Sequence, residues 1–259
     1  MPNVALVLDI SNITCRAYHS VATGKKGQSV LGLSRHRLKS MVTTLLRECD
    51  PLRLMGALDS ETPSFRHELY PDYKGHRGEK PEELRALLAE APGLLKKNFG
   101  VELYHSPDYE ADDVMASIAD ANLAAEWRTA LCTNDRDLLA TAYDAGNLNG
   151  TYILHNHAGS YHALGPAEVQ AKMGVPPHRV ALYKAIAGDK GDAIPGIPLL
   201  GDVAAKRLAN TYPSMTAIFK NLDQLQSSDR KRLEAAGLEY ALLMEQLTTL
   251  RFDVPIRAI

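Results

Sequence analysis

The feature that most constrains the fold is an alternation of short apolar runs with helix-like stretches in the first half of the chain. The apolar runs are Val4–Leu8, Leu54–Leu58, Val101–Tyr104 and Thr129–Cys132, and the stretches that follow them include Leu33–Leu46, Glu82–Lys97, Tyr109–Ala124 and Arg136–Ala142. Short strands that alternate with helices form a parallel α/β sheet. We therefore predict an α/β fold with a mainly parallel central sheet flanked by helices over residues 1–164.

Two segments depart from this alternation. Between Ser60 and Lys80 the chain is polar and basic, and an insertion of this kind inside a compact domain is more often functional than filler. After Gly165 one helix-like stretch follows another, interrupted by the Gly/Pro-rich segment Gly188–Pro198. We predict a helical C-terminal region over residues 165–259 that packs against the sheet.

Charge and cysteine content exclude several classes of protein. The 259 residues carry a formal net charge of -2, so nucleic acid would be attracted only if basic and acidic residues are segregated. Val4–Leu8 is too short for a signal peptide or a membrane span, and Cys15, Cys49 and Cys132 lack the spacing of a zinc site or a disulfide framework. We expect a protein of the reducing cytoplasm with no membrane partner.

Carboxylates stand at the ends of the predicted strands. Asp9, Asp59 and Asp135 lie at or just beyond the C-terminal ends of three apolar runs, where open α/β sheets bind their ligands. Two further acidic groups are Glu110–Asp113 and Asp189–Asp192. If the fold brings these side chains together, their charges repel unless cations neutralise them, and oxygen ligands in this number suit Mg²⁺ or Mn²⁺. Each aspartate alone is equally well explained as a helix cap or turn residue, but the whole set favours a metal site.

One spacing is awkward for a shared metal. In a regular helix Glu110 and Asp113 lie on one face, whereas Asp112 points roughly 200° away from Glu110. Glu110 and Asp112 can reach the same metal only if the helix begins there, and Asp108 is expected to cap that beginning.

Several motifs occur in the order in which they occur in flap endonucleases. They are Leu8–Asn12 with Arg16–His19, Ala57–Asp59, Phe65–Tyr70 with Tyr73, Lys74 and Arg77, Tyr109–Val114, Thr133–Leu138 and Gly188–Gly196. The chain thus resembles this family over roughly residues 4 to 215, and its Glu-Ala-Asp-Asp motif is more similar to the bacterial and phage branch. That branch includes the 5′-nuclease domain of DNA polymerase I and free-standing phage 5′-3′ exonucleases. The resemblance implies a PIN-like 5′-nuclease core, a helical arch at about 60–97 and a helix-three-turn-helix at about 188–210.

The resemblance also implies two metal groups. Asp9, Asp59, Glu110 and Asp112, with Asp113 beside them, are similar to the ligands of one metal, and Asp135, Asp137, Asp189 and Asp192 to those of a second. Two or more Mg²⁺ or Mn²⁺ ions would generate a hydroxide, orient the scissile phosphate and stabilise the leaving oxygen. The product would carry a 5′-phosphate.

Basic and aromatic residues of the arch also have counterparts in the family. Lys74 and Arg77 resemble the cations that hold the scissile phosphate, although a solvated basic loop is the simpler alternative. Tyr73 would stack on an unpaired base, and Arg16 would contact a phosphate or form a salt bridge near Asp9.

The segment Ile194–Asn210 resembles the helix-three-turn-helix, which grips duplex backbone in this family and commonly holds K⁺. The DNA contacts that the resemblance implies are Gly196, Gly201, Lys184, Lys206 and Arg207. This chain departs from the pattern with Leu199 at the family's middle glycine, Val203 near its usual lysine and Ala193 where asparagine is common. The departures place the K⁺ site and part of the duplex grip in question.

The function that we expect is divalent-metal-dependent cleavage of branched or 5′-ended DNA in replication or repair, as a flap endonuclease and 5′-3′ exonuclease. Two alternatives stay open, a catalytically weak DNA-junction binding protein and a ribonuclease that removes RNA primers. Since no polymerase domain follows in this sequence, we expect a stand-alone monomer with a functional link to a separate DNA polymerase.

Two minor features receive the simpler interpretation. His155 and His157 have the residue type of transition-metal ligands, but a surface hairpin is favoured. Lys25 and Lys26 are expected to lie in a solvated loop.

Overall fold

The computed structural model describes residues 3–23, 28–146, 149–157 and 159–259, so Lys25 and Lys26 lie outside the described residues. Within these ranges eight strands form one sheet in the order β5-β6-β4-β1-β2-β3-β8, with β7 paired to β6. The strands are β1 (Val4–Asp9), β2 (Arg53–Ala57), β3 (Glu102–His105), β4 (Arg128–Cys132), β5 (Tyr143–Gly146), β6 (Asn149–His157), β7 (Ser160–Leu164) and β8 (Arg257–Ala258).

The five central strands are parallel, and β5, β7 and β8 pair with them in the antiparallel sense. In β1, Leu8 pairs with Gly56 of β2 and with Cys132 of β4. Because the three strands run in one direction and in register, the residues that follow each of them leave the sheet at the same edge. The predicted α/β class with a mainly parallel sheet is confirmed.

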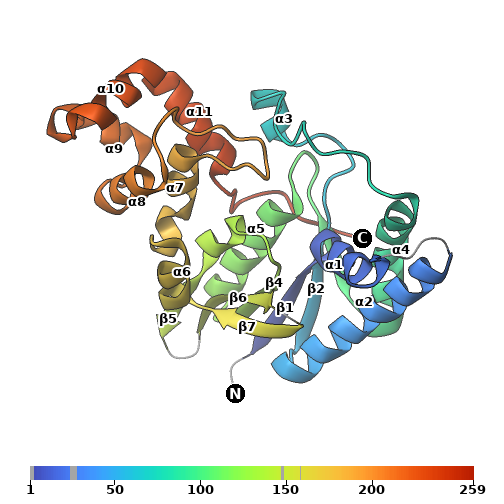
Figure 1. Ribbon diagram of the computed structural model, residues 1–259. Coiled ribbons are helices and arrows are strands. Elements are labelled where there is room, and N and C mark those ends of the chain that lie inside the picture. The colour runs from blue at the N-terminus through green and yellow to red at the C-terminus, as the bar shows by residue number, and fades with distance from the viewer. Residues whose placement is uncertain (1–2, 24–27, 147–148, 158) are drawn as a thin grey trace.

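Helices cover both faces of the sheet (Figure 1). α1 (Ile10–Ala22), α2 (Gln28–Cys49) and α4 (Glu82–Phe99) pack on one face, and α5 (Ala111–Ala124) packs on the other. Successive residues of β1 point to opposite faces of the sheet. Leu6 lies in the core that α1, α2 and α4 cover, and Val7 lies in the core that α5 covers. This explains why the central strands read as continuous apolar runs.

The remaining helices form a third core beside the sheet. They are α6 (Pro166–Met173), α7 (Val180–Ala187), α8 (Asp202–Thr211), α9 (Met215–Lys220), α10 (Ser227–Ala236) and α11 (Leu238–Thr248), with the 3₁₀ turns η1 (Asp137–Thr141), η2 (Pro177–Arg179) and η3 (Leu222–Gln224). Figure 1 shows α7 to α11, together with α3 (Phe65–Leu69), above the carboxyl edge of the sheet. The predicted helix at 136–142 is wrong in type, because this segment is the single 3₁₀ turn η1.

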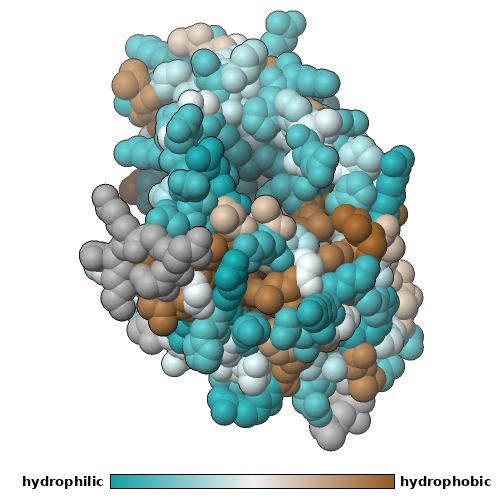
Figure 2. Space-filling model, turned by 90° about the vertical axis from the view of Figure 1, so that its right-hand side faces the viewer, coloured by the Kyte–Doolittle hydropathy of each residue, from teal (hydrophilic) through white to brown (hydrophobic). Residues whose placement is uncertain are grey.

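One face of the molecule is mostly polar (Figure 2). Figure 2 shows hydrophilic residues over most of one face, with hydrophobic residues gathered in a band across its middle. Among the helices that the structure describes, none combines the length and the apolar character needed to cross a bilayer.

Candidate active site

The first two strands each deliver one carboxylate to the edge of the sheet. Asp9 is both the last residue of β1 and the N-cap of α1, and its carboxylate accepts hydrogen bonds from the Asn12 amide at 2.9 Å and the Thr133 hydroxyl at 3.0 Å. Asp59 follows β2 and accepts from the Ser11 hydroxyl at 2.8 Å and the Ala111 amide at 3.1 Å. The two aspartates therefore also tie β1 and β2 to the helices that begin beside them.

The start of α5 resolves the awkward spacing around Asp112. Glu110 is the N-cap of this helix and has extended backbone angles, φ -85° and ψ 162°, so it does not follow helical geometry. Asp112 is then in the first helical turn, and both side chains face one cavity. Asp108 does not cap the helix as predicted, since its backbone is left-handed and its carboxylate accepts instead from the Thr62 hydroxyl at 3.1 Å.

Carboxylates from four segments meet in a cavity of about 240 Å³ at the carboxyl edge of the sheet. The charged residues that line it are Asp9, Asp59, Glu110, Asp112, Asp135, Lys74, Arg77 and Lys80. Burial raises the pKa of Asp9 from 3.8 to about 7, with further contributions from the negative charges of Asp59 and Asp135. Burial likewise raises the pKa of Asp112 and of Asp135. Buried, mutually repelling oxygen donors of this kind are a set that a hard divalent cation would stabilise.

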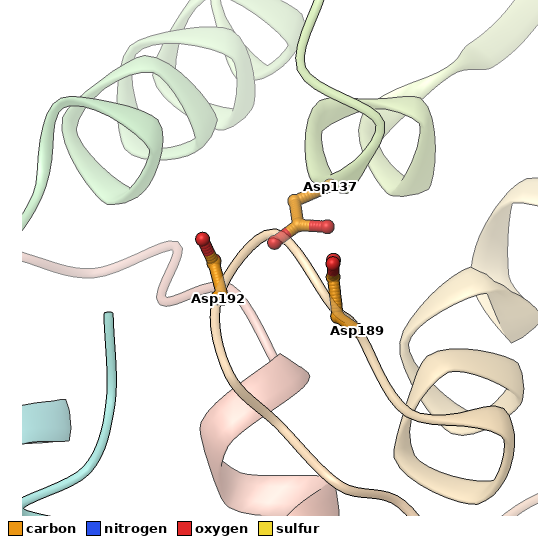
Figure 3. Close-up of side chains that lie close together, drawn as sticks. All are labelled: Asp137, Asp189 and Asp192. Atoms are coloured by element: carbon orange, nitrogen blue, oxygen red, sulfur yellow. The ribbon is translucent and has the colours of Figure 1, made fainter. Parts of the chain in front are cut away.

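A second carboxylate group adjoins the first. Asp137, Asp189 and Asp192 each offer an oxygen atom within 4.8 Å of the others, and Figure 3 shows Asp137 facing the two aspartates of the α7–α8 loop. A neighbouring cavity of about 500 Å³ is lined by Asp189 and Asp192 and shares Asp135 and Arg77 with the first. The two predicted carboxylate groups therefore lie side by side, but Asp135, predicted to belong to the second group, lines both cavities and is absent from the Asp137, Asp189 and Asp192 cluster.

The ammonium group of Lys184 lies inside this second group. Its side chain is buried, and its Nζ forms ion pairs with Asp137 and Asp189. Although burial opposes the charge of Asp189, the Lys184 ammonium lowers the pKa of this carboxyl below its usual value. Lys184, which we predicted to contact DNA, is thus placed as an internal counter-ion of the acidic group.

The segment between α3 and α4 folds down onto both carboxylate groups. Lys74 Nζ lies 2.5 Å from Glu110 Oε1, and the backbone amide of Lys74 donates to the Asp192 carbonyl at 2.9 Å. The guanidinium of Arg77 pairs with the Asp192 carboxylate at 2.7 Å. Burial opposes the charge of Lys74, but Glu110 and Asp192 raise the pKa of its ammonium group. Both cations therefore neutralise part of the acidic charge at this edge of the sheet.

Tyr73 does not have the position that base stacking requires. Its ring is only 3% exposed, and its hydroxyl donates to Glu110 at 2.8 Å and to Asp192 at 3.1 Å. The prediction of an exposed stacking ring is wrong for this conformation, because the aromatic ring fills space between the arch and the C-terminal core.

Asp113 is also separated from the other carboxylates. It is fully buried, and its two oxygens accept from the Arg66 guanidinium at 2.6 Å and 2.9 Å. Arg251 donates a backbone hydrogen bond to the same carboxylate at 2.9 Å. With both oxygens occupied, Asp113 is a structural partner of Arg66 and does not line the metal cavity, which corrects our prediction for this residue. Arg66 was not among the predicted site residues, although its place in the Phe65–Tyr70 motif was a signal.

Arg16 of α1 packs against Tyr161 of β7. Its guanidinium stacks over the Tyr161 ring at 5.5 Å, and neither a salt bridge to Asp9 nor a place in the lining of either cavity is found among the described residues. The predicted salt bridge near Asp9 is therefore wrong. His155 and His157 lie in β6 and pair with β7, as expected for a hairpin.

The predicted duplex-contacting residues fall into two classes. Lys206 and Arg207 on α8 are paired with Asp202 and Asp229. Gly196 has a positive φ, and a Cβ there would lie 2.3 Å from the Gly188 nitrogen, so close backbone packing already explains this glycine.

Gly201 differs from Gly196 in its surroundings. It is the exposed N-cap of α8, and a Cβ added to it would meet no atom within 4 Å. Steric crowding therefore does not explain this glycine.

Two protein-family models together match nearly the whole of this chain. Residues 4–174 match the family model of the 5′-3′ exonuclease N-terminal resolvase-like domain, and residues 175–258 match that of the 5′-3′ exonuclease C-terminal SAM fold. The chain belongs to the 5′-3′ exonuclease family, and the predicted resemblance is confirmed.

Among its relatives are bacterial DNA polymerases I. The thermostable enzyme of Thermus filiformis is 31% identical over 98% of this chain, and that of Thermus aquaticus is 30% identical over 97%. The match covers 29% of the length of either polymerase, so this chain spans less than a third of these relatives.

Solved structures share the fold at low sequence identity. The T5 5′-exonuclease with bound zinc has a TM-score of 0.75 and 20% identity, covering 95% of this chain and 89% of that one. The catalytic core of Rad2 in complex with a DNA substrate has a TM-score of 0.60 and 14% identity, covering 98% of this chain and 79% of that one.

Proposed function

We propose that this chain is a divalent-metal-dependent 5′-nuclease that hydrolyses DNA phosphodiesters at 5′ flaps and 5′ ends. The observation that carries the proposal is the meeting of carboxylates from separate segments of the chain with Lys74 and Arg77 beside them. Family membership supports it, as do the neighbouring structures, which include a T5 flap endonuclease complex with DNA and metal ions.

The carboxylates would hold the metal in two adjacent groups. Asp9, Asp59, Glu110, Asp112 and Asp135 would bind one ion, and Asp137, Asp189 and Asp192 would bind a second. A divalent ion held there would lower the pKa of a water, so that hydroxide forms near neutral pH, and would supply positive charge for the leaving oxygen. We propose Mg²⁺ or Mn²⁺ because the donors are all hard oxygen atoms.

The chain's own cations would position the substrate. A scissile phosphate would replace carboxylates as the partner of Lys74 and Arg77, whose charges would then favour the extra negative charge of the transition state. As water adds to phosphorus, the bond to the 3′-oxygen breaks and that oxygen takes a proton. The products are a 3′-hydroxyl and a 5′-phosphate.

We further propose that the substrate is branched or 5′-ended DNA, including flaps that begin with an RNA primer, and that the protein acts as a monomer in the cytoplasm beside a polymerase. The polymerase I relatives support the link to replication and repair. A K⁺ ion at the helix-three-turn-helix is proposed from the resemblance of the α7–α8 loop. The role of Arg16 at a phosphate stays a prediction.

A cleavage series tests this function. The purified protein is incubated with flapped, nicked and single-stranded DNA, and with an RNA flap, in Mg²⁺, Mn²⁺ or EDTA. We expect metal-dependent cleavage near the flap base that leaves a 5′-phosphate. Binding without cleavage in either metal would support the junction-binding alternative, and cleavage restricted to RNA would support the ribonuclease.

A further inference from the structure

The strand β5 is the outermost strand of the sheet at the end opposite β8, and Figure 1 shows it beside α6. It pairs with β6 on one side, and among the residues that the structure describes no strand pairs with its other side. All four of its residues are exposed. A strand edge of this kind carries N–H and C=O groups that can form a ladder with another extended chain. The outer edge of β5 is therefore able to accept a further strand.

A cavity lies on each face of the sheet beside this edge. One, of about 580 Å³, lies between β5, α5 and η2, on the face that α5 covers. The other, of about 280 Å³, is lined by Arg128 and Tyr152, and Tyr152 packs against the core on the opposite face. Tyr143, Asp144 and Pro166 line both cavities. Because the side chains of a strand alternate between two faces, a strand added to β5 would direct its side chains into the two cavities in turn.

The larger cavity is lined mostly by apolar residues. They come from α5, η1, β5, η2 and the segment after α11, and they include Leu123, Ala140, Tyr143, Pro177 and Phe252. Tyr143 is 53% exposed and Phe252 is 42% exposed, so packing within the described chain leaves much of both residues in water. An apolar side chain from a partner would leave water in this cavity and would cover part of both rings.

The charge around the larger cavity is acidic. Asp120 on α5 and Asp144 on β5 line it and are exposed, and no lysine or arginine lines it within the described part of the chain. In the smaller cavity the guanidinium of Arg128 stacks over the Tyr152 ring at 4.6 Å. The larger cavity therefore repels phosphate groups and favours a partner with a lysine or arginine close to its apolar side chain.

The edge of β5 lies away from the carboxylate centre. β5 pairs with residues 149–151 at the start of β6, and Gly150 in that segment pairs with Arg128 at the start of β4. This is the amino end of the parallel strands, whereas the acidic groups follow their carboxyl ends. Among the described lining residues, none is shared between the cavities beside β5 and the two carboxylate-lined cavities. A partner held at β5 would therefore leave the carboxylates accessible.

We infer that the outer edge of β5 is a docking site for an extended segment of a partner protein, which joins the sheet as a further strand. That segment carries an apolar side chain for the cavity beside α5 and a neighbouring lysine or arginine for Asp120 and Asp144. The strand edge supplies backbone hydrogen bonds, the two cavities receive alternate side chains, and the acidic residues select the charge. Docking there tethers the protein to its partner and leaves the carboxylate groups free to act.

The probe is a phage-displayed library of random peptides of about eight residues, within the length of an ordinary strand, selected against the whole chain without DNA or metal. We expect the enriched sequences to carry apolar residues at alternate positions and a neighbouring lysine or arginine. A synthetic peptide of enriched sequence should slow hydrogen exchange at backbone amides of residues 143–146, because they join a ladder. Methylation of its alternate backbone nitrogens should abolish binding in one register and be tolerated in the other.

Two variants and two matched controls locate the binding. Tyr143→Ser removes the side chain that both cavities share and should weaken the peptide complex by about tenfold. Asp120→Lys reverses an exposed charge and should weaken it by about fivefold. Leu52→Ala removes a leucine that is 68% exposed before β2, and Glu239→Lys reverses an exposed charge on α11. Both controls should bind the peptide as the parent does, and circular dichroism should show that all four variants are folded.

The inference is overturned if the library yields no binding peptide, if Tyr143→Ser and Asp120→Lys both bind the enriched peptides as tightly as the parent, or if the amides of β5 exchange at the parental rate in the complex. A dimer in sedimentation that Tyr143→Ser dissociates would assign the edge to a second copy of this chain and would overturn it as well. Because no DNA or metal is present, the result does not depend on whether the protein cleaves flaps.

Discussion

At the scale of single residues, several carboxylates serve the fold and the site together. Asp9 caps α1 and also lines the cavity, so its replacement affects stability as well as chemistry. Asparagine is an equally good N-cap, which makes Asp9→Asn a variant that removes the charge and keeps the cap.

We expect Asp9→Asn to stabilise the metal-free protein. The folded-state pKa of Asp9, about 7, lies above its usual value of 3.8, so its stabilising contribution is complete below the lower value and is lost as the pH rises through the upper one. At pH 8 in EDTA the variant should therefore melt roughly 3–8 °C higher than the parent. Circular dichroism from pH 8 to pH 4 checks this, and the gain should shrink as the pH falls. An equal gain from the exposed Asp120→Asn would contradict the explanation.

Asp113→Asn should have the opposite signature. Arg66 is buried, and removal of its bidentate partner leaves a poorly paired guanidinium, at a cost of roughly 3–5 kcal/mol. Denaturant unfolding measures that loss. Isothermal titration with Mn²⁺ at a temperature where the variant is folded should give the parental stoichiometry. A variant of parental stability that binds fewer ions would show that Asp113 is a metal ligand after all.

At the scale of elements, the sequence was informative where local rules decide the outcome. Apolar runs followed by aspartates located β1, β2 and β4, since the carboxyl ends of parallel strands share an edge. The antiparallel strands β5 and β8 are short and exposed, so they lack the apolar pattern that identifies a strand. Local preference predicts Asp108 as the N-cap of α5, whereas the N-cap is Glu110.

The arch shows what local rules cannot supply. The positions of Tyr73 and Lys74 depend on contacts with Glu110 and Asp192, which are distant in sequence. A tyrosine and a lysine in a polar stretch read as exposed, and only tertiary packing buries the ring. The ion pairs of Lys184 with Asp137 and Asp189 could not be predicted from the sequence for the same reason.

Lys74→Ala tests the arch as a working element. Loss of this cation should lower turnover by about 10²–10³-fold, as for other groups that stabilise transition-state charge. Single-turnover cleavage of a 5′ flap at saturating enzyme measures the effect. Lys97→Ala, an exposed lysine in the last turn of α4, provides the control. If both variants cleave at the parental rate, Lys74 has no role in the chemistry.

At the scale of the whole molecule, the net charge of the chain is close to zero, but many of its carboxylates are gathered at the carboxyl edge of the sheet. Two sheet cores and a helical core position the two carboxylate groups, and cations from the arch and from α7 neutralise part of their charge. Bound divalent ions would complete the neutralisation and link the sheet to the C-terminal helices.

The central claim is tested most directly by Asp192→Ala on a 5′-flap substrate in Mg²⁺, with flap affinity measured in parallel in EDTA. Asp192 belongs to the second carboxylate group, and within the described residues the hydrogen bonds of its side chain go to Tyr73 and Arg77 of the arch, so the variant should fold. We expect cleavage to be abolished or greatly slowed, while flap affinity stays close to that of the parent. Cleavage at the parental rate would contradict the account of two metal-binding groups.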